Sequence, residues 1–485
     1  MKKYIITENM CREDVFVFSK RNLKLMSFMV MLSLCMKAQE TIELISGNSP
    51  ATTQNINSQF GTIAQDYKKS VTIYKRKKEG SFRSCTGTLL NTVNQNGKYY
   101  ILTAAHCVEA NEGEDFSGYF SFNYEALTPS HRQDLKIAAK FRTTVMKKLD
   151  EYDIALLEMD LSSSRYAVFF KNVYFSGWSI RNTHQPNFLV SHIRGDLKKI
   201  DFVTSSVYGK FKPIGIRRLI PMVKITDYRF NNDPNRKGES GTGLRNDSGK
   251  VLVVYTNGRL ETPNNNFCSL LSNSWYDEIF DELLIQQYLD PDLTYVSEIP
   301  GGYGIEDKTH KIESSQFDLT IQPNQVLETS QMIKLNLFEL YQYSRGADVL
   351  DIGGILKKEG NVGLKITVSP NNGISSPIVI YESNTNGSSS EGTFIQNIVK
   401  DISESDINTI MNSLGINTIS IHSHEFDFNV PVTIELKNTG TSLAKVRALK
   451  IPGLGYRNAV ELFKPNDFAA LYTNKIIPKI EEKQA

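Results

Sequence analysis

The chain has 485 residues, 55 of them basic and 53 acidic, and 40% of them are hydrophobic. A chain of this length exceeds one ordinary domain, so we expect two or three. No block of like charge has the pattern of a nucleic-acid-binding arm or a polybasic membrane patch, so nucleic acid is not an expected partner.

Residues 1–38 have the pattern of a signal peptide. Lys20, Arg21 and Lys24 precede the apolar run 25–35, and Ala38 stands at a plausible cleavage point. The run is too short to span a bilayer, and no other run predicts a membrane span. We therefore expect a secreted protein, extracellular or periplasmic, after removal of this segment.

Cleavage there would leave three cysteines, Cys85, Cys107 and Cys268, in the mature chain. Export permits disulfides, and an odd count leaves one thiol over. Cys85 and Cys107 lie close together in sequence and are the predicted pair. Closing their loop would stabilise the fold by roughly 3 kcal/mol.

The predicted elements begin after a polar lead-in at residues 39–64. Short strand-like runs separated by turn residues follow over 65–292, and their spacing predicts an all-β barrel or sandwich. At the end of this part, residues 276–291 carry apolar side chains at helical spacing, which predicts a helix that stops at Pro291.

The glycine-rich residues 293–309 are expected to be a linker. Strand-like runs resume over 310–452, which we interpret as a separate β-sandwich domain, interrupted by one predicted helix at 403–414. Residues 453–485 are assigned to a C-terminal tail, part of which could be helical.

The stretch YYILTAAHCV, residues 99–108, places His106 at the end of a strand-like run and directly before Cys107. A histidine in this position is often structural, but it can also serve as a general base. A bridge from Cys107 to Cys85 would hold the imidazole beside the preceding strand.

Two further motifs carry the other groups that a serine hydrolase needs. Asp153 opens the apolar run IALL, where a buried carboxylate requires a partner such as a histidine Nδ1–H. Ser240 lies in GESGTGL, whose glycines allow a sharp turn, and the N–H groups of Gly238 and Ser240 could converge on a developing oxyanion. Each motif alone has an ordinary structural explanation, but their joint occurrence predicts a Ser-His-Asp triad.

These motifs, with CTGTLLN at 85–91 and FSGW at 175–178, resemble the trypsin-like (chymotrypsin-fold) serine proteases, closest to their bacterial lysyl endopeptidase-like branch. The resemblance covers about residues 65–292 and implies two six-stranded β-barrels. It also implies a polypeptide substrate, with His106 as the base, Asp153 as its orienting carboxylate and Ser240 as the nucleophile. No cofactor is expected.

The same resemblance suggests residues that contact the substrate. Trp178 matches a tryptophan found near the active site in that branch, and Thr256 and Asn257 are expected to edge the substrate strand. Ser274 stands where the lysine-specific members carry an Asp, so lysine specificity is not expected to transfer. Asp277 is nearby and could act as an offset substitute.

Glu239 stands where most trypsin-like enzymes carry an Asp, and the chain shows no Ile-Val-Gly-Gly start, so activation by a new N-terminus is not expected. The altered pocket and the large appended region leave a second hypothesis open. Under that hypothesis the chain is a weak or inactive protease-fold protein that binds or adheres through 310–452, to a partner that the sequence does not identify. His422 and His424 would share one strand face, but no third ligand is evident and no metal site is predicted.

Overall fold

The computed structural model describes residues 54–55, 64–78, 81–95, 97–122, 124–125, 137–159, 173–181, 184–203, 205–211, 220–226, 239–256, 266–277, 282–303, 312–336, 354–368, 377–383, 394–396, 404–413, 427–451 and 454–473. In this part of the chain, no helix is long and apolar enough to cross a membrane.

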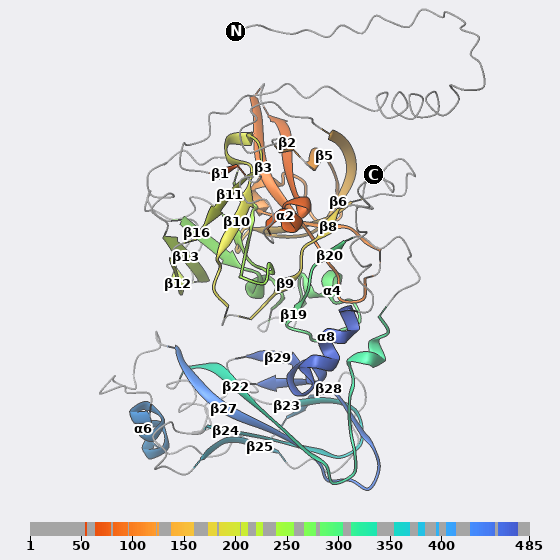
Figure 1. Cartoon of the computed structure of the whole chain (residues 1–485), viewed down its shortest axis with the longest axis vertical. Coiled ribbons are helices and arrows are strands. Elements are labelled where there is room, and N and C mark those ends of the chain that lie inside the picture. The colour runs from red at the N-terminus through yellow and green to blue at the C-terminus, as the bar shows by residue number, and fades with distance from the viewer. Residues whose placement is uncertain are drawn as a thin grey trace, which may run out of the picture. The chain divides into compact units, whose positions relative to one another are not determined.

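The first sheet is a closed antiparallel barrel of six strands, drawn mainly in orange in Figure 1. One set of its apolar residues forms a core that includes Leu89, Ile101 and Phe120, each at most 1% exposed, and alternate residues such as Leu90 and Leu102 belong to a second core. Strand β4, YILT, is buried along its whole length because Ile101 packs into the first core while Tyr100 and Leu102, on the opposite face, pack into the second. In barrel order the strands are β2 (Val71–Lys78), β3 (Ser81–Leu90), β4 (Tyr100–Thr103), β7 (Ile154–Met159), β6 (Ile137–Leu149) and β5 (Asp115–Phe122).

The second sheet is also antiparallel along its main path, with a short parallel pairing at its side. Its core includes Leu189, Val253 and Leu244, all fully buried. The path runs β1 (Gln54–Asn55), β11 (Lys199–Phe202), β10 (Phe188–Ser191), β14 (Gly243–Arg245), β15 (Val251–Tyr255), β16 (Asn266–Leu270), β13 (Ile220–Thr226) and β12 (Ser205–Phe211), and β9 (Trp178–Ser179) pairs with β15.

The segment expected to be a linker is paired with strands in its described part. β19 (Glu298–Ile299) pairs with β9, and β20 (Gly302–Tyr303) pairs with β8 (Tyr174–Phe175). Residues 298–303 are therefore fixed by backbone hydrogen bonds to elements more than a hundred positions earlier.

The predicted helix at 276–291 is wrong for most of its length. The chain forms a small hairpin of β17 (Tyr276–Asp277) and β18 (Glu282–Leu283), and only α4 (Gln286–Leu289) is helical. The N–H of Ile285 donates to the carbonyl of Ser274 instead of continuing a helix. Of the apolar residues at helical spacing, Leu284 is buried and Leu283 and Tyr288 are partly buried, while Ile279 and Phe280 lie outside the described residues.

Two further sheets form the C-terminal β-sandwich, and the fold class is thus all-β as predicted. On β27, alternate residues Val430, Val432, Ile434 and Leu436 are buried, which is the period-two pattern of a strand with one solvated face. One sheet contains β21 (Leu319–Ile321), β28 (Ala444–Ile451), β23 (Gly354–Glu359), β26 (Phe394–Gln396) and β29 (Gly455–Asn458), and the other β22 (Val326–Asn336), β27 (Asp427–Asn438), β24 (Val362–Val368) and β25 (Ile378–Ser383).

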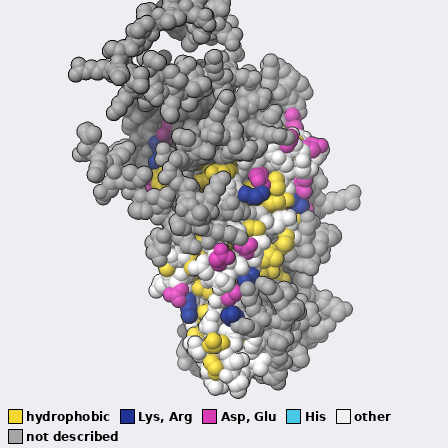
Figure 2. Space-filling view, turned by 90° about the vertical axis from the view of Figure 1, so that its right-hand side faces the viewer, with side chains coloured by type: hydrophobic (Ala, Val, Ile, Leu, Met, Phe, Trp, Pro, Cys, Tyr) yellow, Lys and Arg dark blue, Asp and Glu magenta, His cyan; other side chains and the backbone are white. Residues whose placement is uncertain are grey.

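Helices complete this part of the chain. The helix predicted at 403–414 is confirmed as α6 (Glu404–Ser413). The segment assigned to a tail contains α7 (Ala459–Phe463) and α8 (Pro465–Thr473), whose side chains Ala459, Phe468 and Tyr472 are buried. On the face shown in Figure 2, the described Lys and Arg side chains are interspersed with Asp and Glu, so this part is not dominated by one sign of charge.

Candidate active site

His106 and Asp153 form a close pair. His106 lies in η4 (Ala105–Cys107), a single 3₁₀ turn that follows β4. Its Nδ1 is 2.8 Å from Oδ2 of Asp153, and its backbone N–H donates to Oδ1 at 2.9 Å. The carboxylate is buried, whereas the imidazole side chain is 35% exposed. The accessible part of the pair is therefore the histidine ring, whose Nε2 is not bonded to Asp153.

The backbone brings the Asp153 carboxylate to the histidine by an uncommon conformation. Asp153 has φ of 54°, in the left-handed region, immediately before β7. Aspartate tolerates this region better than most residues, because its short polar side chain can bond locally. The carboxylate reaches back from the start of β7 to the turn after β4, which is its neighbour in the barrel.

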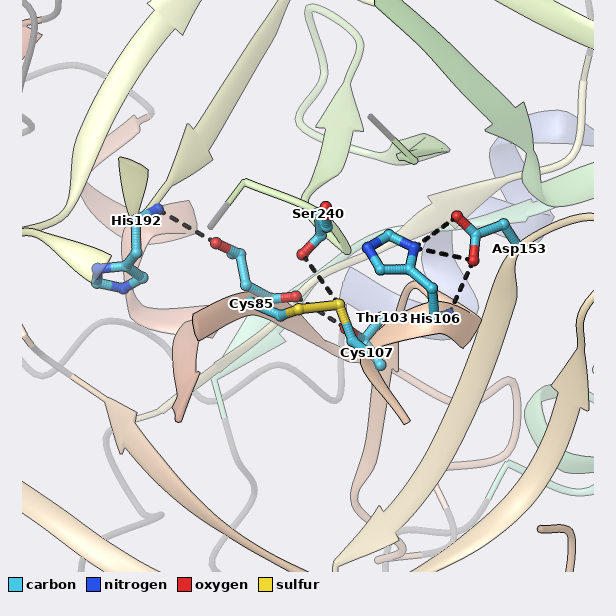
Figure 3. The surroundings of a disulfide bond; sticks show 8 residues. Cys85, Thr103, His106, Cys107, Asp153, His192 and Ser240 are labelled. Carbon is cyan, nitrogen blue, oxygen red and sulfur yellow. Dashed lines mark hydrogen bonds and ion pairs between the residues drawn. A yellow bond between two sulfur atoms is a disulfide. The ribbon is translucent and has the colours of Figure 1, made fainter. Parts of the chain in front are cut away.

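The predicted Cys85–Cys107 disulfide is confirmed, with Cα atoms 6.3 Å apart. It joins β3 to the turn that carries His106, as Figure 3 shows. These two cysteines and His106 are also the one cluster of possible metal ligands among the described residues, but the sulfurs are bonded to each other. The cross-link therefore has a bracing role for the histidine.

Ser240 lies in a turn that is held against the barrel. Its carbonyl accepts a hydrogen bond from the N–H of Thr86 at 2.9 Å, and the next N–H, of Gly241, donates to Tyr255 at 2.8 Å. Gly241 has φ of 89°, and a Cβ there would lie 2.2 Å from Oγ1 of Thr103 and from the carbonyl oxygen of Thr86. Only glycine fits this close approach of the turn to β3 and β4.

Figure 3 shows the imidazole of His106 between Asp153 and Ser240. Within the described residues, Ser240 Oγ and His106 Nε2 do not form a hydrogen bond. Such bonds are often long without a substrate and tighten when one binds. The structure thus brings the three predicted triad residues together, in the chain order His, Asp, Ser.

The residues predicted to contact the substrate or its oxyanion differ in where the structure places them. Gly238 and Asn257 lie outside the described residues. Thr256 is buried at the end of β15, where its hydroxyl donates to the carbonyl of Phe267. Ser274 is fully buried, and its hydroxyl donates to the carbonyl of Leu271 at 2.8 Å.

Trp178 lies in the core, where it is fully buried. Its indole N–H donates to the carbonyl of Asn91 at 2.9 Å, and its ring packs 4.4 Å from that of Trp275, centroid to centroid. This burial does not support a substrate contact for Trp178, because the two tryptophans cover each other. The histidines His422 and His424 lie outside the described residues.

The remaining cysteine lies near the Ser240 turn. Cys268, on β16, is a fully buried free thiol. Burial raises the pKa of this thiol well above its usual value, and the nearby Glu239 carboxylate raises it further. The thiol therefore stays protonated at neutral pH and is not a competing nucleophile.

Sequence reasoning missed three side chains near the site, Thr86, Thr103 and Ser191. Thr103 donates through its hydroxyl to the carbonyl of Thr86, and Ser191 donates to Oε1 of Glu239 at 3.0 Å. Serines and threonines inside strands carry no distinctive pattern, and only the position of Thr86 beside Cys85 could have pointed to it.

A comparison with protein families relates part of the chain to a protease family. Residues 46–266, less than half of the chain, match the family model "Lysyl endopeptidase, C-terminal domain". No curated protein matches the chain.

Three solved proteases illustrate the similarity to known structures, each at low sequence identity. The active form of the Rv3671c protease from M. tuberculosis is 12% identical over 48% of this chain and 90% of that one, with a TM-score of 0.30. The thermostable serine protease AL20 from an extremophilic microorganism is 12% identical over 42% and 91%, with a TM-score of 0.28. The MamO protease domain from Magnetospirillum magneticum is 13% identical over 43% and 94%, with a TM-score of 0.27.

TM-scores this low carry no argument, so the assignment rests on the family match and on the closed six-stranded barrel followed by a second antiparallel sheet. The chain therefore resembles the trypsin-like serine proteases of the chymotrypsin fold, in their lysyl endopeptidase-like branch.

Proposed function

We propose that the chain is a serine endopeptidase that hydrolyses peptide bonds through an acyl-enzyme. The observation that carries this proposal is the His106–Asp153 pair, braced by a disulfide and lying beside the Ser240 turn. The family match supports a protease function in general, and the residue roles are our inference.

The first half of the reaction forms the acyl-enzyme. Oγ of Ser240 attacks the carbonyl carbon of the scissile bond while Nε2 of His106 accepts its proton. Asp153 accepts the Nδ1–H hydrogen bond and stabilises the imidazolium that forms. The tetrahedral intermediate collapses, the C–N bond breaks, and His106 gives its proton to the departing amine.

The second half regenerates the enzyme. Water attacks the ester carbonyl while His106 accepts its proton, and the ester C–O bond then breaks as His106 gives that proton to Oγ of Ser240, which releases a carboxylic acid and the free enzyme. The N–H groups of Gly238 and Ser240 are the proposed donors to the oxyanion in both halves. Removing one such donor typically costs about 10²- to 10³-fold in kcat.

The bond preference is left open. Ser274 is buried with its hydroxyl bonded to Leu271, and it provides no counter-charge for a lysine side chain. We therefore propose a polypeptide substrate without a lysine requirement.

We also propose that the protein is exported after removal of residues 1–38. The Cys85–Cys107 disulfide supports this proposal, because structural disulfides persist in oxidising compartments. The N-terminal sequence of the protein recovered outside the cytoplasm is expected to start at Gln39. A protein that starts at Met1 and is retained in the cytoplasm would contradict export.

Hydrolysis of a denatured protein substrate by the purified chain tests the activity. Ser240→Ala is expected to abolish turnover, because the nucleophile is lost. Ser248→Ala is the matched control, since Ser248 lies eight positions further on in an exposed turn and bonds Asn246. Equal rates for Ser240→Ala and the parent would refute the proposal, and a parent without turnover would favour the alternative of a protease-fold binding protein.

A further inference from the structure

Thr86 makes hydrogen bonds to three different segments around the candidate site. Its N–H donates to the carbonyl of Ser240 at 2.9 Å, and its own carbonyl accepts from Oγ1 of Thr103 at 2.9 Å. Its hydroxyl oxygen accepts from the backbone N–H of His192 at 3.2 Å. Thr86 is fully buried, so these bonds are shielded from water.

The segments that Thr86 joins are the ones that carry the reacting groups. Thr103 ends β4, which leads directly into the turn of His106. Cys85, the residue before Thr86, is cross-linked to Cys107, the residue after His106. The base is thus tied to β3 through the disulfide and through the Thr103 hydroxyl.

The other side of Thr86 leads to the nucleophile through the second sheet. His192 follows Ser191 at the end of β10, and the hydroxyl of Ser191 donates to Oε1 of Glu239 at 3.0 Å. Glu239 is the residue before Ser240, and both Ser191 and Glu239 are fully buried. A continuous path of buried contacts therefore runs from the hydroxyl of Thr86 through β10 to the Ser240 turn.

We propose that Thr86 is a positioning residue for Ser240, and that its hydroxyl fixes the end of β10, through which Ser191 holds Glu239 and the nucleophile turn. This inference rests on the proposed function. The two halves of the catalytic group are carried by different sheets, the histidine by the barrel and the serine by the second sheet. The hydrogen bond from the N–H of His192 to the Thr86 hydroxyl is one of the described bonds that join the second sheet to the barrel at this point.

Thr86→Val tests the hydroxyl alone. Valine has nearly the same shape and keeps the backbone N–H that donates to Ser240, but it cannot accept from His192. We expect the rate of Ser240 labelling by a fluorophosphonate and kcat to fall together, by about tenfold to a hundredfold, with KM nearly unchanged, because a small misplacement of reacting groups has effects of this size. Thr86→Ser, which restores the hydroxyl, is expected to recover most of both rates.

Two further variants complete the test. Thr72→Val is the matched control, because Thr72 is a fully buried threonine of the same barrel whose hydroxyl donates to the carbonyl of the next residue. It is expected to label at the parental rate. Ser191→Ala provides a second measurement if Thr86→Val does not fold, and it is expected to slow labelling and kcat to a similar degree.

The outcomes separate this inference from the proposed function. A parent that labels at Ser240, with Thr86→Val or Ser191→Ala labelling just as fast, overturns the positioning role alone. The same holds if Thr86→Ser is as slow as Thr86→Val, because packing and not the hydroxyl would then matter. A parent that does not label overturns the proposed function and the positioning role together.

Discussion

The most informative residue is Asp153, because its buried carboxylate contacts the candidate base, His106, at two places. It is 2% exposed, its backbone occupies the left-handed region, and it receives both the ring and the backbone N–H of His106. Burying a carboxylate is costly unless donors satisfy it, and here the histidine supplies them. The same contacts orient the imidazole so that Nε2 faces Ser240 (Figure 3).

Asp153→Asn is therefore expected to leave the protein folded and to lower kcat by about 10⁴-fold, the size of effect seen when a triad carboxylate becomes an amide. The amide oxygen can still accept from the backbone N–H of His106, but the side chain no longer favours the tautomer that accepts the Ser240 proton. Steady-state kinetics at neutral pH measure the change. A drop of less than tenfold would show that Asp153 does not orient the base.

The sequence motifs predicted which residues meet at the site, and the structure brings His106, Asp153 and Ser240 together. They could be predicted because each lies in a short motif whose chemistry is local. The contacts of Thr86 and Ser191 could not, because serines and threonines inside strands form no motif that announces their partners. The burial of Trp178 against Trp275 depends on which strands become neighbours.

At the scale of elements, the disulfide between β3 and η4 was predictable from the cysteine count and spacing alone. Alkylation of the unfolded, unreduced mature chain is expected to modify Cys268 and to leave Cys85 and Cys107 unmodified. Breaking the bridge by Cys85→Ala with Cys107→Ala is expected to lower the free energy of unfolding by about 3 kcal/mol. Three reactive thiols without reductant would contradict the pairing.

Lys198, the residue before β11, is buried, and we expect it to make the stability of the fold depend on pH. Lys198 is fully buried, and burial lowers its pKa to about 8, although the carboxylate of Glu125 acts in the opposite direction. Its ammonium donates to the carbonyl of Lys68 at 2.6 Å. In the unfolded chain a lysine has a pKa of about 10.4.

Between pH of about 8 and 10.4, the unfolded chain therefore binds more protons at this position than the folded one. The contribution of Lys198 to the free energy of unfolding is therefore expected to increase as the pH rises across that window. Lys198→Met should remove this contribution, whereas Lys98→Met, at a largely exposed lysine, should retain it. Urea denaturation at pH 7.5, 9 and 10 measures the slopes, and parallel slopes for Lys198→Met and the parent would argue against a buried, shifted lysine.

The strands were easier to predict than the short helices. Apolar residues alternate along β27 because one face of that strand is buried, and they run continuously along β7 because both faces are buried. Both patterns can be seen in the sequence. The apolar residues of 276–291 also repeat at helical spacing, but their backbone hydrogen bonds return to Ser274 and Trp275. Spacing alone does not distinguish these two ways of burying the same side chains.

At the scale of the molecule, residues 44–485 form one compact unit by their contacts. One buried core includes Leu90 and Trp178 together with Ile434 and Tyr472. The carboxylate of Glu461, on α7, accepts from the N–H of Ser297 at 2.7 Å and also pairs with Arg181. The C-terminal residues are therefore integrated with the protease-like part instead of attached by a free linker.

Glu461→Gln is expected to lower the free energy of unfolding by about 1–3 kcal/mol, because a buried charge-assisted hydrogen bond is lost. Glu328→Gln, on the exposed side of β22, is the matched control and should change it by less than about 0.5 kcal/mol. Urea denaturation of the full chain compares the two. An effect of Glu461→Gln no larger than that of the control would show that this contact does not hold the C-terminal residues in place.

The proposed mechanism requires that Ser240 is a nucleophile activated by His106. Mass spectrometry of the mature chain after treatment with a fluorophosphonate tests it most directly, with His106→Ala as the comparison. We expect one labelled peptide, modified at Ser240, and no labelling in His106→Ala. No labelling of a folded parent whose Cys85–Cys107 bridge is intact, or labelling that persists in His106→Ala, would contradict it.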